Sequence, residues 1–524
     1  MAVSKNKEKV GGMVINWITI FSQIVISLFF VPFFLKIVGD KQYGLYSFST
    51  SIIAWIDTLM VAIASAYFKF LTREKKINGE YGEARACGVF WIIFVVISIL
   101  VLILGIGFDS LLFFDVIKLH EYTVAEKNQI CLIILMSIIS TTISCFLSVR
   151  KSYHYYKQKY ILVYSFSLVQ IVLQTALSII ALKLGFGVTA VAAIHFGLAV
   201  IFTIILSILS KLFLKEKVSI KPISETDKLY RKTLFKEIVV FSGFIIINTV
   251  VDMMNRTLDK TILGFYNASS VATYQLAYTL PSYLISFTSI ISIVFDPHIT
   301  DAFYNKGGMQ KVNEIFVKVS KLQIIVTFLI IGGFITCGKE FVFLWLDDSR
   351  IQVYHIAVIL MLTYSLTCCN RLAIIARRIQ NYHIKASFIY LGIALFNVAL
   401  SLLLINITSR EFAIWACVIG TVTTYLIGHW IIMQIYDAKV AKINIKSFMK
   451  EFIKYTMIML TVAIVTNRFV DITFSIPNNL YIFLIKGFLY LIIYFAAFCF
   501  IDLAFIKECL LFIKNKNSRQ NEEK

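Results

Sequence analysis

The strongest constraint on this chain is a long succession of apolar stretches separated by short polar connections. About fourteen stretches occur between residues 13 and 506, and roughly 20 apolar residues cross the ~30 Å hydrocarbon core of a bilayer. Because 59% of residues are apolar and only 15% are charged, little length remains for a soluble domain. We therefore predict an all-α membrane protein with about 14 transmembrane helices. The predicted spans are 13–38, 43–69, 86–108, 130–149, 161–183, 188–210, 238–264, 270–296, 319–341, 354–374, 387–406, 412–434, 452–470 and 481–506.

The placement of basic residues predicts the orientation of the chain. The formal net charge is +20. With a cytoplasmic N-terminus, about 38 of the 50 Lys and Arg residues fall on the cytoplasmic side and about 9 on the other, a strong positive-inside bias. We therefore predict that both termini are cytoplasmic, that the cations contact membrane lipid headgroups, and that nucleic acid is not a partner.

The longest cytoplasmic connection, from Lys211 to Glu237, divides the spans into six, six and two. Each six-span set has a glycine break before its second span, at Gly39 and at Gly264. An even number of spans makes both sets enter the membrane in the same direction, which is the parallel-repeat arrangement of many transporters. We predict two pseudo-symmetric six-helix lobes, 1–215 and 238–434, a cytoplasmic basic linker, 216–237, and a final segment, 435–524, with a basic link, two additional helices and a cytoplasmic tail.

Polar side chains gather in the seventh predicted span at steps of three and four residues, which places most of them on one helical face. They are Asn248, Asp252, Asn255, Arg256, Asp259 and Lys260. In one interpretation this face lines a hydrated cavity, and Arg256 and Lys260 receive an anionic substrate there. In the other, the charges pair with one another and fix helix packing, while Asp259 and Lys260 reach the outer interface. The cavity interpretation makes Arg256, Lys260, Asp252, Asn255 and Asn248 the candidate substrate-binding residues.

Other ionisable residues lie within or at the ends of spans. Asp57 is near the middle of the second span, where a charged group costs at least ~2.5–3.5 kcal/mol, so it is either an ion-coupling site or a carboxyl kept neutral by neighbouring hydroxyls. The candidate ion-coupling residues are Asp57, Asp252 and Asp259. The candidates for a basic rim at the inner mouth are Lys69, Arg73 and Arg371. Alternatively, Lys69 extends to the lipid headgroups.

The sequence lacks the common signatures of catalysis. It contains no G-x-x-x-x-G-K-[ST] sequence, no His-Glu zinc pattern and no nucleophile elbow. The nine cysteines are scattered without metal-ligand spacing. We therefore predict that the chain is not an enzyme and has no cofactor and no metal site.

Three stretches resemble a known family, the bacterial polysaccharide flippases of the multidrug/oligosaccharidyl-lipid/polysaccharide exporter superfamily. They are Pro32–Tyr46, Leu258–Gly264 and Gly338–Trp345, and the resemblance covers nearly the whole chain. One departure is Met60-Val61-Ala62, where many relatives carry an Asp–Gly-type pair.

The resemblance implies an alternating-access flippase in the bacterial cytoplasmic (inner) membrane. Its substrate would be an undecaprenyl-diphosphate-linked oligosaccharide for capsule, O-antigen or exopolysaccharide synthesis, with transport driven by H⁺ or Na⁺. Polysaccharide polymerase and chain-length proteins would be partners. Two alternatives stay open: a cation-coupled multidrug exporter of the same superfamily, and a membrane polysaccharide polymerase or ligase. The short external loops disfavour the second.

Overall fold

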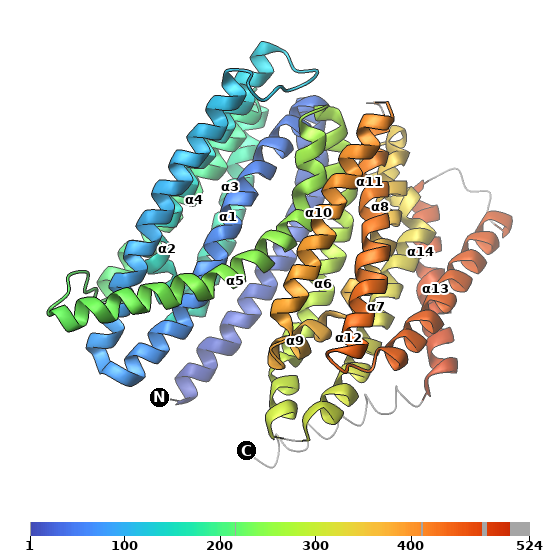
Figure 1. The fold of residues 1–524 in the computed structure, drawn as a ribbon. Coiled ribbons are helices and arrows are strands. Elements are labelled where there is room, and N and C mark those ends of the chain that lie inside the picture. Colours follow the sequence, from blue (N-terminus) through green and yellow to red (C-terminus); the bar gives the residue numbers. More distant parts are fainter. Residues whose placement is uncertain (1, 215, 306, 410–411, 474–478, 504–524) are drawn as a thin grey trace. The chain divides into compact units, whose positions relative to one another are not determined.

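The computed structural model describes residues 2–214, 216–305, 307–409, 412–473 and 479–503 (Figure 1). Within these ranges, the side chains of residues 2–7, 9–10, 56–65, 244, 248, 252, 255, 293–294, 297 and 305 are not described. The described segments form helices joined by turns and short connections.

The helices follow one another along the chain as the hydropathy pattern predicts. The first six are α1 (Ala2–Phe113), α2 (Val124–Tyr156), α3 (Tyr160–Lys183), α4 (Val188–Phe213), α5 (Glu225–Gly264) and α6 (Ala268–Asn305). They are followed by α7 (Gly308–Trp345), the 3₁₀ turn η1 (Asp348–Arg350), α8 (Ile351–Cys369), α9 (Arg371–Ile379) and α10 (His383–Ile407). The last are α11 (Ala413–Tyr425), the π-helical η3 (Leu426–Ile432), α12 (Met433–Lys439), α13 (Ile445–Thr473) and α14 (Asn479–Ile501).

The long α1 contains the first three predicted spans, and its backbone leaves the helical conformation between them. Gly39 has φ 76° and Gly79 has φ 60°. Glycine adopts positive φ without the steric cost that a Cβ imposes, so the chain can change direction at both positions. The glycine break predicted at Gly39 is thereby confirmed.

The chain divides into two compact units. Unit 1 comprises residues 1–275 and 387–424, and unit 2 comprises residues 276–386 and 425–524. Unit 1 therefore contains α1 to α5, the first turns of α6, most of α10 and nearly all of α11. These boundaries differ from those of the predicted lobes, and the pseudo-symmetric division of the sequence stays a prediction.

An aromatic core connects three helices of unit 1. Tyr67, Phe90 and Phe94 of α1 pack with Tyr153 of α2 and Ile238 of α5, all of them buried. Burial of large aromatic side chains contributes strongly to packing. This core holds the start of α5 against α1 and α2.

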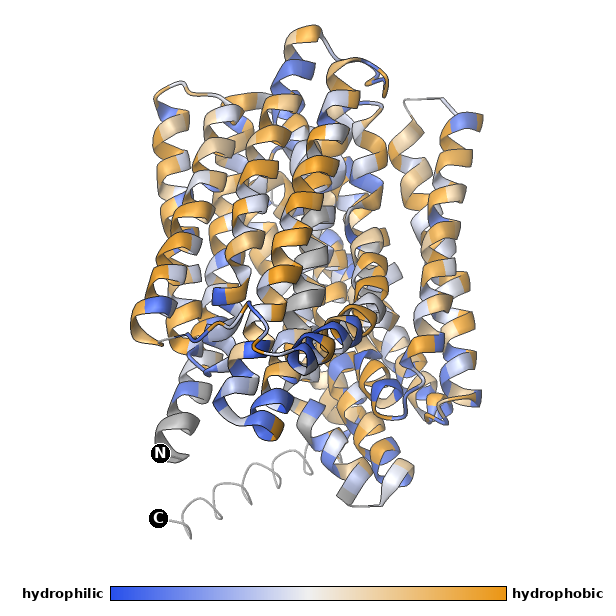
Figure 2. Cartoon of the chain, turned by 60° about the vertical axis from the view of Figure 1, so that its left-hand side comes forward, coloured by the Kyte–Doolittle hydropathy of each residue, from blue (hydrophilic) through white to orange (hydrophobic). Residues whose placement is uncertain are grey.

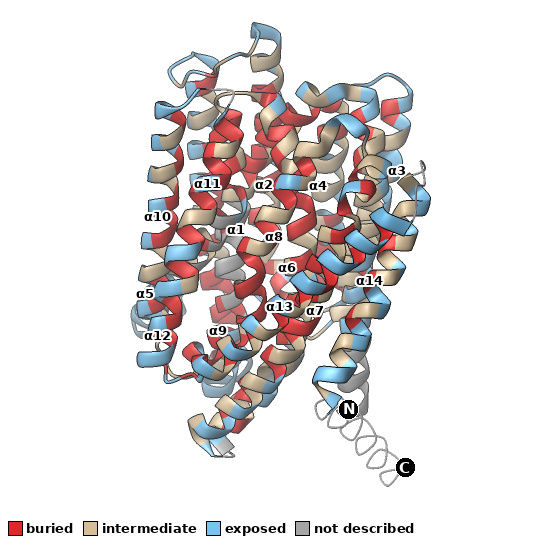
Figure 3. Cartoon of the chain, turned by 90° about the vertical axis from the view of Figure 1, so that its right-hand side faces the viewer, coloured by how far each residue is buried: buried red, intermediate tan, exposed pale blue. Residues whose placement is uncertain are grey.

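In unit 2, α7 is the helix on which its neighbours pack. α8, α13 and α14 all lie against it. The hydroxyls of Tyr490 and Tyr494 on α14 donate hydrogen bonds to the carbonyl oxygens of Phe328 and Ile325 on α7, at 3.0 and 2.9 Å. The opposite side of α14 is exposed (Figure 3), with Phe488 among its outward apolar side chains. The two C-terminal helices thus belong to unit 2 and cover α7.

Eleven helical segments of the described chain are long and apolar enough to cross a membrane. Figure 2 shows hydrophobic colouring along most of the length of the long helices and polar colouring mainly towards their ends. Large apolar side chains such as Phe29 and Leu104 are exposed, as expected where a helix faces lipid. An all-helical membrane protein is confirmed. The count of fourteen spans and the cytoplasmic position of the termini stay predictions.

Candidate functional site

A cavity of about 370 Å³ lies within unit 1, between the first two segments of α1, the end of α5 and the start of α6. Aromatic and aliphatic side chains form one part of its lining, and hydroxyls, an amide and an ammonium group form the other. The lining residues are Phe30, Val31, Phe34, Tyr43, Tyr46, Ser47, Thr50, Ser51, Ala54, Thr257, Lys260 and Gln275. Among these residues Lys260 carries the charge.

The lysine is held by a neighbour from the next helix. Its Nζ donates a hydrogen bond of 2.7 Å to Oε1 of Gln275. A neutral amide satisfies one of the three ammonium donors without cancelling the charge. Lys260 can therefore attract an anionic group inside the cavity.

Hydroxyl groups on the opposite side of the cavity are also fixed. Tyr46 and His195 share a hydrogen bond of 2.9 Å between the phenol oxygen and Nδ1. Ser51 contacts Thr261 at 3.2 Å, and the indole of Trp55 donates to the same Thr261 hydroxyl at 3.2 Å. These contacts join α1 to α4 and α5. The cavity thus has a preformed polar wall.

Two glycines allow the helices around the cavity to approach closely. A Cβ on Gly44 would lie 1.7 Å from the carbonyl oxygen of Ala268, and a Cβ on Gly264 would lie 1.8 Å from the ring of Phe48. A larger residue at either position would overlap its neighbour, and at Gly44 that neighbour is backbone. The sequence analysis identified Gly264 only as a break, whereas the structure shows that it is also a packing position.

The connection between α1 and α2 covers the turn between α5 and α6. The hydroxyl of Tyr122 donates to the carbonyl oxygen of Gly264 at 2.7 Å. The backbone N–H of His120 donates to the carbonyl oxygen of Phe265 at 3.0 Å. The amide of Asn267 donates to the carboxylate of Glu121. This connection therefore holds the α5–α6 turn beside the cavity.

Asp259 lies in a second polar cluster of unit 1, which joins α5, α6, α10 and α11. One carboxylate oxygen, Oδ2, accepts hydrogen bonds from Tyr274 and, at 2.7 Å, from Thr421. The amide of Asn397 donates to Thr421 at 3.2 Å, and Ser401 donates to Asn397 at 3.3 Å. Asp259 is only 5% exposed, and its Oδ1 accepts no hydrogen bond from any described residue.

The structure separates the predicted seventh-span residues. Lys260 lines the cavity, Asp259 belongs to the cluster beside α11, and Arg256 is exposed. The carboxylate of Asp259 is buried among protein side chains, and both interpretations of the polar face stay predictions. The side chains of Asp57, Asn248, Asp252 and Asn255 lie outside the described residues.

The three candidates for the inner-mouth rim occur in both units. Lys69 lies over the ring of Phe241, 3.6 Å from its centroid. Arg73 pairs with Glu237 at 2.7 Å and with Glu74 at 3.3 Å. Arg371 belongs to unit 2. The role of these cations in a rim stays a prediction.

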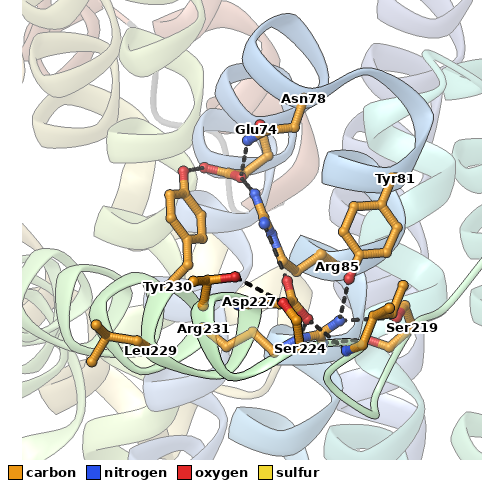
Figure 4. Close-up of polar contacts among 12 residues, drawn as sticks. Glu74, Asn78, Tyr81, Arg85, Ser219, Ser224, Asp227, Leu229, Tyr230 and Arg231 are labelled. Carbon is orange, nitrogen blue, oxygen red and sulfur yellow. Dashed lines mark hydrogen bonds and ion pairs between the residues drawn. The ribbon is translucent and has the colours of Figure 1, made fainter.

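A buried charge cluster that sequence analysis missed connects α1 to the start of α5 (Figure 4). Arg85 lies between Glu74 and Asp227, with nitrogen–oxygen distances of 2.8 and 3.2 Å. Arg231 pairs with Asp227 at 2.7 Å and donates to the carbonyl oxygen of Ser219 at 2.6 Å. Part of the predicted linker is therefore docked on α1. The only signal in the sequence was an i,i+4 spacing of Asp227 and Arg231, which is common on solvated helices.

Another carboxylate with a buried side chain lies in the connection between α4 and α5. Glu216 is 3.6 Å from Arg150 of α2. Burial raises the pKa of Glu216 to about 7, while the Arg150 charge acts in the opposite direction. The pKa of this carboxyl group in the predicted linker therefore lies above the ordinary range of a glutamate.

Unit 2 contains a further buried ion pair that the sequence did not reveal. Lys486 of α14 lies 3.0 Å from Glu340 of α7, and both residues are about 8% exposed. Asp471 approaches the same ammonium at 3.4 Å. The two carboxylates lie about 15 and 146 residues from Lys486 along the chain, so spacing alone could not pair them. Among the described residues there is no group of three or more residues suited to hold a metal ion.

Comparison with solved structures defines the class of fold. No family model and no curated protein matches the chain. Solved structures do match, and they show that the chain has the fold of the transporters of the MOP superfamily. The similarity is one of fold, and membership of the superfamily implied by the resemblance stays a prediction.

One matching structure is that of the lipid II flippase MurJ in an inward closed conformation, with a TM-score of 0.68 and 15% identity, covering 94% of this chain and 100% of that one. A second is an inward-facing multidrug resistance MATE family transporter, with a TM-score of 0.59 and 13% identity, covering 82% and 98%. A MOP superfamily transporter from Pyrococcus furiosus has a TM-score of 0.52 and 14% identity, covering 83% and 97%. These proteins are transporters and a flippase, and this chain shares their fold.

Proposed function

We propose that this chain is an alternating-access flippase that moves undecaprenyl-diphosphate-linked oligosaccharides across the bacterial cytoplasmic membrane. The product would supply capsule, O-antigen or exopolysaccharide synthesis, with a polysaccharide polymerase and chain-length proteins as partners. The resemblance of three sequence stretches to polysaccharide flippases supports this substrate class, and the fold shared with a lipid II flippase supports the flippase activity.

The observation that carries the proposal is the cavity with Lys260 in its wall. A diphosphate is anionic, and an ammonium group in a partly desolvated site attracts it more strongly than it would in water. Tyrosine rings and hydroxyls, supplied by Tyr43, Tyr46, Ser47 and Thr50, suit the mixed apolar and hydroxylated surface of a sugar. No carboxylate is present among the described lining residues, which agrees with an anionic substrate.

Ion coupling is assigned to Asp259 in this proposal. Its carboxylate is buried, accepts two hydroxyl donors and retains an oxygen that accepts no bond from the described residues. Such a group can bind a proton or, with neighbouring oxygens, Na⁺. Lys260 is the next residue on α5, so a change at Asp259 can alter the helix that carries the cavity lysine. Arg256, Asp252, Asn255, Asn248 and Asp57 remain proposed participants.

Transport of a labelled lipid-linked oligosaccharide between leaflets of proteoliposomes tests the proposal. We expect Lys260→Gln to lower the initial rate roughly tenfold or more, since a charge-assisted contact to phosphate is lost. Lys260→Arg should retain much of the rate because it keeps the charge. Lys183→Gln, which changes an exposed lysine on α3, is the matched control.

Equal rates for wild type and Lys260→Gln would contradict the role of Lys260 in the cavity. Absence of leaflet transfer by the wild-type protein would contradict the flippase proposal itself.

A multidrug exporter is the second candidate, because MATE family transporters share the fold. An exporter of cationic drugs should bind its substrates more tightly when the positive charge of Lys260 is removed, because like charges repel. The flippase predicts the reverse for an anionic lipid. Binding measurements with Lys260→Gln and both ligands therefore separate the two candidates.

A further inference from the structure

α5 is longer than a membrane span needs, and its first turns precede the predicted span 238–264. α5 has 40 residues, and at about 1.5 Å per residue it extends for about 60 Å, twice the ~30 Å hydrocarbon core. Figure 1 shows its first turns crossing α1 and α2 at a steep angle. The predicted span, 238–264, leaves about the first third of α5, residues 225–237, outside the hydrocarbon core.

The orientation of this part of α5 about its own axis is fixed by the face that packs against α1 and α2. Asp227, Arg231, Leu234 and Ile238 are buried and recur at steps of three and four residues. The two charged residues belong to the Arg85 cluster, and the two apolar residues belong to the aromatic core. The face on the other side of the helix must point away from unit 1.

That outer face carries cations and apolar side chains together. Lys228, Lys232 and Lys236 follow one another at four-residue steps and are exposed. Leu229 is 68% exposed and Phe235 is 37% exposed. A water-facing surface would not favour these apolar groups, whereas a lipid interface accepts apolar groups and lysines on the same face.

We propose that the first third of α5, residues 225–237, is a membrane-surface helix that binds anionic lipid headgroups of the cytoplasmic leaflet. We call the set Lys228, Lys232 and Lys236 the α5 lysine stripe. Its positive charge complements phosphate headgroups, and the apolar side chains beside it enter the acyl boundary. The proposal does not depend on which substrate the cavity accepts.

The segment before α5 extends the same surface. Phe213 and Ile223 are each 75% exposed, while the backbone between them is anchored by the N–H of Ser219, which donates to the carbonyl oxygen of Ala84 at 2.9 Å. The chain is thus held against α1 with its apolar side chains directed outward. In this proposal the exposed side chains of Phe213 and Ile223 also contact lipid.

Lipid binding to the purified full-length protein tests the lysine stripe. Detergent-solubilised protein is titrated with phosphatidylglycerol or phosphatidylethanolamine, and bound lipids are counted by native mass spectrometry. Each basic residue near an anionic surface contributes about a fivefold factor in affinity. We expect the triple variant K228Q/K232Q/K236Q to weaken phosphatidylglycerol binding roughly tenfold or more and to leave phosphatidylethanolamine binding unchanged.

The matched control is K36Q/K118Q/K183Q, which removes three exposed lysines from the opposite end of the spans of unit 1. It should keep the preference of the wild type for phosphatidylglycerol. Retention of that preference by the stripe variant, or an equal loss in the control, would overturn the proposal.

A depth measurement tests the apolar part separately. Leu229→Trp is reconstituted in bilayers with brominated lipid, and the emission of the six native tryptophans is subtracted with the wild type. Quenching of the added tryptophan is expected. An unquenched tryptophan would show that this face meets water or another protein, such as one with an acidic surface, and would overturn the proposal.

Discussion

At the scale of single residues, Asp259 and Lys260 illustrate what the sequence could and could not predict. Both were expected to be functional because they lie in a polar run within an apolar span. Their separation by one helical step, about 100°, sends them to different surroundings. Lys260 faces the cavity and Asp259 faces Tyr274 and Thr421. The hydroxyl partners lie far away in the sequence or on another helix, so no local pattern could identify them.

Ion coupling by Asp259 can be tested by removing its charge. Asp259→Asn keeps the shape and the hydroxyl contacts but removes the ionisable group. We expect transport in proteoliposomes to lose its response to an imposed pH or Na⁺ gradient, because the group that binds the ion is gone. Coupling between two binding sites typically changes affinity by about 5- to 150-fold, so the loss should be measurable. Asp348→Asn, in the exposed η1 turn, is the control. A gradient response equal to that of the wild type in Asp259→Asn would refute the coupling role.

At the scale of helices, the glycine positions determine how closely the start of the second span approaches α6. In the sequence, Gly44 lies between aromatic residues at the start of the second predicted span, and this pattern gives no information about which residue it contacts. In the structure the partner is the carbonyl oxygen of Ala268, which cannot move aside as a flexible side chain can. The resulting contact, together with the hydrogen bond of Tyr122 to Gly264, holds the start of the second span and the α5–α6 turn close together beside the cavity.

Gly44→Ala should therefore weaken the close packing of the start of the second span against α6. Overpacking typically costs about 1–3 kcal/mol, enough to shift a two-state equilibrium about 5- to 150-fold. Ser47→Cys places a reporter thiol in the cavity wall. We expect a membrane-impermeant thiol reagent added from outside to label this thiol faster when Gly44→Ala is also present than when Gly44 is kept. Gly107→Ala, where the added Cβ meets open space, should leave the labelling rate unchanged. If both glycine variants label at the same rate, the close contact at Gly44 does not control access.

At the scale of the whole molecule, hydropathy predicted the helices well because each span must satisfy its backbone hydrogen bonds internally. The C-terminal segment contains the helices α13 and α14, of which α14 is long and apolar enough to cross a membrane, so the predicted extra pair of spans stays a prediction. What hydropathy could not predict is which helices pack together, since that depends on buried pairs such as Arg85 with Asp227 and Lys486 with Glu340. The division into two units follows from such contacts and differs from the division expected from the internal repeat.

The pair of Lys486 and Glu340 leads to a prediction about how the C-terminal helices are anchored in unit 2. Removing one partner of a buried ion pair strands the other charge and costs about 3–5 kcal/mol. Lys486→Met and Glu340→Gln should each lower the melting temperature of the detergent-solubilised protein. The double variant should be more stable than the sum of the single effects implies, because no charge is left unpaired. The exposed pair Lys311 and Glu314, changed to Gln singly and together, should show small and additive effects. Additive losses at Lys486 and Glu340 would mean that α14 is anchored to α7 by its tyrosines and apolar contacts rather than by this charge pair.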